Sequence, residues 1–189
     1  MGKKKEEKVD NQKYVDFYLE YIKNTRKTWN SQSSQINQQS AYLRLANELG
    51  NITYIYNDVI ANGVKIDTKE VTSKIGDISY CVARLLDELF YMHEEPFAKA
   101  NATNPTLFDT IAIEMGNILG NGASENVKDI EIIDLILTLP CYYRDIYTGA
   151  ATKDGKGFLI SVLSLASNLA DLSHKLGKNY GKILADNVK

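Results

Sequence analysis

The sequence predicts an all-α protein. Apolar residues recur at the three- and four-residue spacing of amphipathic helices along most of the chain, and no stretch shows the sustained alternation that is typical of a strand. The three prolines fall where helices are expected to start, end or kink (Pro96, Pro105 and Pro140). Several of the 12 tyrosines lie inside the apolar helical stretches, where a buried hydroxyl group needs a partner. These observations predict roughly six to eight helices.

In its first half, the chain is predicted to form four helices, at about residues 11–29, 38–61, 67–91 and 94–104. The charged residues 1–10 are expected to be a disordered tail. The polar segment 30–40 is either a loop or the start of the second helix. Asn62-Gly63 is a usual end of a helix, and Asp67 or Thr68 is the expected N-cap of the third.

Four further segments of the second half are predicted to be helical, at about residues 107–119, 125–147, 158–177 and 179–189. Pro140 is expected to kink or split the second of these helices. The segment 149–157 contains three glycines and is expected to be a loop.

Two short similarities indicate an internal repeat. Asn-Glu-Leu-Gly-Asn-Ile at 47–52 and Ile-Glu-Met-Gly-Asn-Ile at 113–118 share Glu-x-Gly-Asn-Ile, and the segment around Asn101 resembles the segment around Asn187. The order of the two similarities predicts two related helical units, 11–105 and a more divergent 106–189. A chance similarity between apolar helices is the alternative.

The composition is that of a soluble globular protein. With 189 residues, 44% of them apolar, the chain is long enough for one full-sized core or for two smaller fused units. The formal net charge of −2 gives no reason to expect nucleic acid or an anionic membrane as a partner. No apolar run is long enough to cross a bilayer, and no apolar region follows the charged start, so we expect a cytoplasmic protein. Cys81 and Cys141 both lie in apolar helical patterns and are expected to be buried.

Two polar clusters interrupt the apolar helices of the first unit. Glu48 and Asn51 stand three residues apart on one predicted helix, and Lys74 and Asp77 stand three apart on the next. This spacing places each pair on one helix face, one turn apart. Because the rest of both helices is apolar, the polar groups need partners, and antiparallel packing would bring all four into one pocket.

The order of these features resembles the MazG-like, all-α nucleoside triphosphate pyrophosphohydrolases, which include the dimeric dUTPases. Four elements carry the resemblance: Arg26 to Trp29, Glu48 to Asn51, Lys74 to Tyr80, and Asn101. The family has Glu-x-x-Glu at the second element and Glu-x-x-Asp at the third. The resemblance implies a nucleotide-binding site composed of Arg26, Trp29, Glu48, Asn51, Lys74, Asp77, Tyr80 and Asn101.

The chain departs from the family at two acids. In the family four carboxylates hold Mg²⁺, whereas here Asn51 and Lys74 stand where two of them are expected. We therefore expect no metal site and no catalytic residue. The ammonium of Lys74 either replaces the metal and pairs with phosphates, or forms an ion pair that closes an abandoned site. Trp29 and Tyr80 either stack on a base or pack in the core.

Three functions follow from these observations. The first is a protein that binds or sequesters a linear or cyclic nucleotide without hydrolysis, for example a viral sponge for a host nucleotide immune signal. The second is a Mg²⁺-dependent pyrophosphohydrolase that uses Glu48, Asp77 and further acids such as Asp58 or Glu70. The third is a helical assembly protein whose old site is a relic. Tyrosine-rich apolar faces favour a homo-oligomer.

Overall fold

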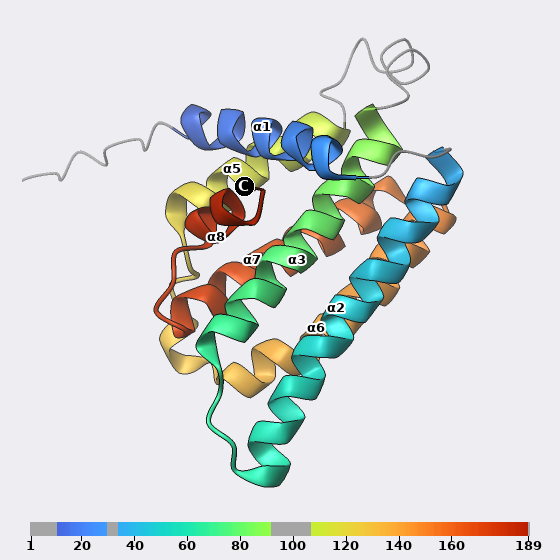
Figure 1. Cartoon of the computed structure of the whole chain (residues 1–189). Helices are drawn as coiled ribbons and strands as arrows, with labels where there is room; N and C mark the ends of the chain where they lie inside the picture. The colour runs from blue at the N-terminus through green and yellow to red at the C-terminus, as the bar shows by residue number, and fades with distance from the viewer. Residues whose placement is uncertain (1–10, 30–33, 92–106, 189) are drawn as a thin grey trace, which may run out of the picture.

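The computed structural model describes residues 11–29, 34–91 and 107–188, which form seven α-helices and no strand (Figure 1). The prediction of an all-α protein is confirmed. The predicted tail, the predicted helix at 94–104 and Asn101 lie outside the described residues. The helices are α1 (Gln12–Thr28), α2 (Ser34–Asn62), α3 (Thr68–Leu86), α5 (Leu107–Asn121), α6 (Ile132–Ala151), α7 (Gly155–Lys175) and α8 (Tyr180–Asn187). A π-helical turn, η1 (Asp87–Tyr91), continues α3, and a short 3₁₀ turn, η2 (Val127–Asp129), precedes α6.

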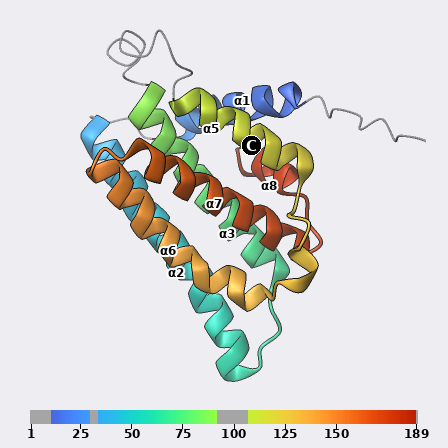
Figure 2. The same cartoon turned by 180° about the vertical axis from the view of Figure 1, so that it is seen from behind.

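Helix α3 lies at the centre of the fold. It packs against α1, α2, α7 and α8, and most of its second half is buried. A helix that is apolar on nearly every side is stable only when other elements cover it all round. Helices α6 and α7 form an antiparallel pair behind α3, and α2 runs along α6 in both views, while α1 and α5 cross one end of the molecule (Figures 1 and 2).

The helix ends in the first half follow from local chemistry. Helix α2 already includes Ser34, so the polar segment from that residue onward is the start of the helix. The helix ends at Asn62, and Gly63 follows with a φ of +62°, a conformation that costs glycine little. The Asp67 carboxylate caps α3 by accepting hydrogen bonds from the backbone N–H groups of Lys69 and Glu70, at 2.8 and 3.2 Å.

The second half differs from the prediction at both ends of α6. The helix begins at Ile132 rather than near 125, because the preceding residues form η2 and the Ser124 N–H donates to the Asp171 carboxylate. It is not split at Pro140 and continues to Ala151. Gly149 therefore belongs to the helix, not to a loop: a Cβ at this residue would lie 2.7 Å from the Phe158 nitrogen, so only glycine permits the tight packing of α6 on α7.

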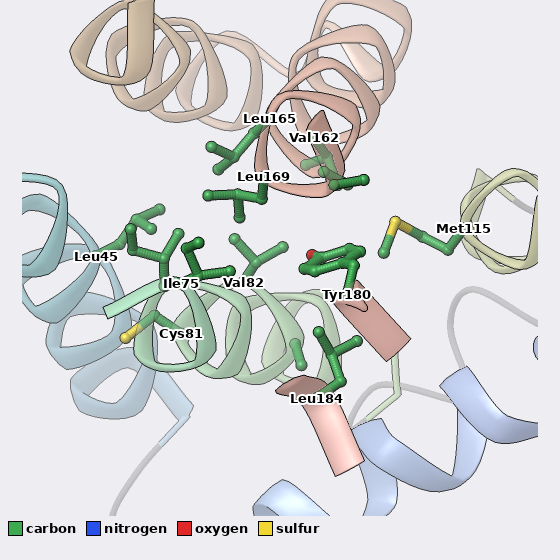
Figure 3. Packing of buried hydrophobic residues seen from close by; sticks show 14 of the residues in the cluster. Leu45, Ile75, Cys81, Val82, Met115, Val162, Leu165, Leu169, Tyr180 and Leu184 are labelled. Carbon is green, nitrogen blue, oxygen red and sulfur yellow. The ribbon is translucent and has the colours of Figure 1, made fainter. Parts of the chain in front are cut away.

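Side chains from distant parts of the chain meet between α3 and α7. Figure 3 shows Tyr180 of α8 inserted beside Val82 of α3, with Met115 of α5 opposite its ring. The Tyr180 hydroxyl lies 3.0 Å from Ser79 Oγ, so the buried polar group has a partner, and burial raises the pKa of Tyr180 to about 12. Tyr180 thereby fixes α8 against α3.

The two cysteines differ in environment. Cys81 is buried in the core, as predicted, whereas Cys141 is exposed on α6, so the prediction that it is buried is wrong. The apolar pattern of α6 is continuous enough to include Cys141, but only one face of this helix packs against α2 and α7. No helix in the described ranges is long and apolar enough to cross a membrane.

Candidate functional site

The structure brings the two polar clusters of α2 and α3 together. Lys74 Nζ lies 2.9 Å from Glu48 Oε2 and 3.5 Å from Asp77 Oδ2, so the ammonium lies between two carboxylates. Asn51 Nδ2 donates to the same Glu48 oxygen at 3.1 Å. We call Glu48, Asn51, Lys74 and Asp77 the polar quartet. Its geometry follows from the antiparallel packing of α2 on α3, in which the polar face of one helix meets that of the other.

Apolar neighbours hold the polar quartet in place. Each residue of the quartet is followed directly by a large apolar residue. These four apolar residues are at most 2% exposed: Leu49, Ile52, Ile75 and Ile78. These residues anchor both helices in the core. The polar side chains are consequently held at its edge, where their exposed fractions are 18% for Glu48, 25% for Lys74 and 37% for Asp77.

The electrostatics of the polar quartet favour the charged forms of the ion pair. Burial raises the pKa of Glu48, but hydrogen bonds from Lys74 and Asn51 and the ammonium charge outweigh it, so the net shift is downward. The hydrogen bond to Glu48 raises the pKa of Lys74, against the opposing effect of burial. Two carboxylates facing one ammonium leave the quartet with a single net negative charge. The cation is thus neutralised from within the protein.

Asn187, at the end of α8, joins this site. Its Nδ2 donates to Asp77 Oδ1 at 3.2 Å, and its Oδ1 is buried and has no hydrogen-bond partner among the described residues. The similarity between the segments around Asn101 and Asn187 was the only sequence signal for this residue. The family resemblance implies Asn101 for this site, but Asn101 lies outside the described residues; among the described residues the asparagine that contacts Asp77 is Asn187 of α8.

An open pocket of about 360 Å³ adjoins the quartet; we call it the polar pocket. It is lined by Thr28, Arg44, Glu48, Asp77, Tyr80, Cys81, Asn187 and Val188. Sequence reasoning did not single out Arg44, whose position on α2 one turn before Glu48 was the available signal. The charges of Arg44 and Lys74 balance those of Glu48 and Asp77. The polar pocket is therefore close to neutral overall and rich in hydrogen-bonding groups.

The two aromatic candidates form one wall beside the polar pocket. The rings of Trp29 and Tyr80 lie 5.9 Å apart between centroids, and the Tyr80 hydroxyl lies 2.9 Å from Thr28 Oγ1. The guanidinium groups of Arg44 and Arg84 lie over the Trp29 ring, at 4.7 and 5.3 Å from its centroid. Trp29 is thus stacked within the protein, and of the two rings Tyr80 is the one that lines the pocket.

Arg26 belongs to a different cluster. It pairs with the Asp87 carboxylate, with N–O distances of 2.5 and 2.8 Å. Asp87 and Glu88 are both fully buried in η1, and Arg84 lies between them, 2.6 Å from Asp87 and hydrogen-bonded to Glu88. This buried network ties the end of α1 to the end of α3. Arg26 is not among the residues that line the polar pocket, whereas Thr28, two residues further along the chain, is.

The second Glu-x-Gly-Asn segment has the same internal geometry in a different setting. Asn117 Nδ2 donates to Glu114 at 3.1 Å, as Asn51 does to Glu48. However, Asn117 Oδ1 accepts from Asn11 at 2.7 Å, and a Cβ on Gly116 would lie 2.5 Å from the Val15 side chain. This segment lies in the contact between α1 and α5 and packs these two helices together. The corresponding segment of α2, in contrast, borders the polar pocket.

Within the described ranges, no three His, Cys, Asp or Glu side chains are grouped closely enough to hold a metal ion. Glu48 and Asp77 are the two acids of the site, and Lys74 lies between them at 2.9 and 3.5 Å. A divalent cation in this position would meet an ammonium at close range, which strongly disfavours it.

Comparisons of the chain with protein-family models, with curated proteins and with solved structures gave no match.

Proposed function

We propose that this protein binds a nucleotide in the polar pocket and holds it without hydrolysis. The observation that carries the proposal is the position of Lys74 Nζ between Glu48 and Asp77, beside an open pocket. A MazG-like pyrophosphohydrolase needs a divalent cation between its carboxylates to bridge the phosphates and to activate a water molecule. An internal ammonium keeps the two carboxylates fixed but supplies neither function.

The lining of the polar pocket suits the neutral, hydrogen-bonding part of a nucleotide. Glu48 and Asp77 accept hydrogen bonds, as ribose hydroxyls and the N–H groups of bases require, and Arg44 donates them. Tyr80 offers an aromatic surface at one side. The pocket volume of about 360 Å³ falls in the range of small-molecule sites. Sequestration of a nucleotide needs only such a pocket and slow release, and no chemical step.

We further infer that the chain contains two related helical units. Helix α2 packs on α3 as α6 packs on α7, and α1 contacts α3 as α5 contacts α7. By this comparison α1, α2 and α3 of the first unit correspond to α5, α6 and α7 of the second. Each helix also contacts its counterpart: α1 contacts α5, α2 contacts α6 and α3 contacts α7. An approximate two-fold axis gives such a pattern. This correspondence makes α6 the counterpart of α2. The repeated Glu-x-Gly-Asn motif, however, lies on α2 and α5, so the motif does not occupy equivalent helices of the two units.

Isothermal titration of a nucleotide panel tests the proposed function. We expect wild-type protein in EDTA to bind at least one linear or cyclic nucleotide, and Asp77→Ala to weaken binding because it removes a lining acceptor. Incubation with Mg²⁺ is expected to release no pyrophosphate or monophosphate at an ordinary enzymatic rate. Metal-dependent cleavage that is abolished by Asp77→Ala would establish the hydrolase alternative, and absence of binding to the whole panel would refute the proposal.

One observation favours the assembly alternative. Large apolar side chains are exposed on the neighbouring helices α2 and α6, where Leu43 is 70% and Leu137 is 59% exposed. If such side chains gather on one face of the molecule, a second copy of the chain can cover them. Light scattering of wild type and of Leu43→Lys distinguishes the cases, because a homo-oligomer that uses this surface dissociates in the variant and a monomer is unchanged.

A further inference from the structure

A second pocket lies on the other side of Asn187, in the groove between α3 and α8. It has a volume of about 610 Å³, and we call it the lysine pocket. Its lining comes from the first half of α3 and from α8 with the residues before it: Lys69, Thr72, Ser73, Gly76, Lys178, Asn179, Lys182, Ile183, Asp186 and Asn187. Asn187 lines both pockets, so they are neighbours separated by its side chain.

The charges of the two pockets differ. Among the described residues that line the lysine pocket, Lys69, Lys178 and Lys182 contribute three ammonium groups and Asp186 contributes the one carboxylate. In the described residues no carboxylate pairs with any of the three lysines, in contrast to Lys74, which two carboxylates neutralise. The Ser73 hydroxyl makes no hydrogen bond to a described residue and is free to donate. The lysine pocket therefore offers an excess of cations, with three ammonium groups against one carboxylate among its described lining residues.

We propose that the lysine pocket binds a chain of phosphate groups, and that a nucleotide bridges the two pockets across Asn187. This inference rests on the proposed function for its second part only. Phosphate oxygens are anionic acceptors, and three ammonium groups that no described carboxylate neutralises attract them far more strongly than the neutralised Lys74 does. The phosphates consequently lie beside Lys69, Lys178 and Lys182, and the nucleoside lies in the polar pocket.

Asn187 has the chemistry to connect the two parts. Its Nδ2 is committed to Asp77, whereas its buried Oδ1 lacks a partner among the described residues. Leaving a buried carbonyl oxygen unpaired costs free energy, which a donor from the ligand recovers. In the proposed complex a ribose hydroxyl at the boundary of the two pockets supplies that donor, after the Asn187 side chain turns to expose the oxygen. Gly76 permits the arrangement, because any Cβ at this residue would collide with the Asn187 amide.

Titration of inorganic triphosphate into the full chain in EDTA tests the lysine pocket without any nucleoside. We expect wild type to bind it with an affinity that falls as salt is raised. The double variant Lys178→Ala/Lys182→Ala should lose at least about tenfold in affinity, because two cations that face the anion are removed. Lys182→Arg should retain binding. Lys156→Ala is the matched control: this exposed lysine in the first turn of α7 lines neither pocket and should bind as wild type does.

Nucleotides and their nucleosides are titrated in parallel, so that the two proposals can fail separately. If nucleotides bind but the double variant binds them as tightly as wild type, the lysine pocket is refuted and the proposed function stands. If triphosphate binding is lost in the double variant but nucleotides bind no better than triphosphate, the lysine pocket stands and the nucleotide assignment fails. An equal loss in Lys156→Ala, or no binding by wild type, refutes the lysine pocket.

Discussion

Asn187 lies directly on Gly76. A Cβ built on this glycine would lie 2.8 Å from Asn187 Nδ2, which is closer than real side chains approach. The contact joins the last turn of the chain to the middle of its central helix, and it separates the polar pocket from the lysine pocket. A side chain at residue 76 would therefore disturb both pockets at once.

Gly76→Ala and Gly50→Ala form a matched pair. Both glycines lie inside helices, but a Cβ on Gly50 meets nothing within 4 Å. Gly50→Ala should raise the free energy of unfolding by about 1 kcal/mol, the usual helix-propensity gain. Gly76→Ala should not raise the free energy of unfolding, because the new Cβ displaces Asn187 and the cost offsets the gain in helix propensity. Chemical denaturation measures both. Asn187→Gly should restore the benefit of Gly76→Ala, and equal stabilisation of the two single variants would show that the contact is unimportant.

Lys74→Met tests the ion pair with Glu48. The lowered pKa of Glu48 means that its contribution to stability is present above its ordinary pKa of 4.5 and is lost as the pH falls below that value. The raised pKa of Lys74 means that its contribution is present below 10.5 and is lost at higher pH. Lys74→Met should therefore cost about 1 kcal/mol between these limits. In urea titrations the difference in the free energy of unfolding between Lys74→Met and wild type should shrink below pH 4.5 and above pH 10.5. A difference that is independent of pH would argue against the ion pair.

Lys74→Glu should convert the polar quartet into a cation site. Three carboxylates then face one another at residues 48, 74 and 77, and their repulsion is relieved by a divalent cation. We expect the variant to be less stable than wild type in EDTA. Saturating Mn²⁺ or Mg²⁺ should raise its melting temperature by about 5 °C. Wild type and Lys74→Met should not respond, and a similar response in all three proteins would mean that the ions bind elsewhere.

Cys81 and Cys141 should differ sharply in reactivity. Burial, with a contribution from the charge of Glu48, raises the pKa of the Cys81 thiol to about 12, so almost no thiolate exists at pH 8. Cys141 is exposed. Maleimide should modify one thiol within minutes at pH 8 and the second only after denaturation, as mass spectrometry can follow. The Cys141→Ser variant isolates Cys81, and rapid labelling of that variant would indicate that the core opens readily.

Arg84→Met should be severely destabilising. Arg84 is 3% exposed and lies between two carboxylates that are themselves fully buried, Asp87 and Glu88. Because Asp87 keeps its contact with Arg26, removing the Arg84 cation leaves the buried Glu88 carboxylate without its ion-pair partner, at a cost of about 3–5 kcal/mol. Arg144→Met removes an exposed ion pair with Asp145 and is the control, with little effect expected. Thermal denaturation of both variants measures the difference, and a stable Arg84→Met protein would mean that Arg26 alone can hold the network together.

The sequence by itself determined the class of fold, because helical periodicity is a local property of the chain. The same holds for the Asp67 cap and for the pairing of Glu48 with Asn51 on one helix face. Antiparallel packing of the two helices predicted that the four polar residues meet, but it left open whether Lys74 pairs with a carboxylate or with a ligand; the structure has Lys74 in contact with Glu48. The resemblance also implied an asparagine at the site, Asn101, which lies outside the described residues.

Only the tertiary structure showed that Asn187 contacts Asp77 and where the cations gather. Asn187 is separated from Asp77 by 110 residues, and Lys178 and Lys182 reach α3 only because Tyr180 anchors α8 beside Ser79. Such contacts depend on how helices distant in the chain pack, and helical periodicity carries no information about which helices become neighbours. The same reason explains why Cys141 is exposed and Cys81 is buried in similar apolar patterns: burial is decided by what covers a helix face.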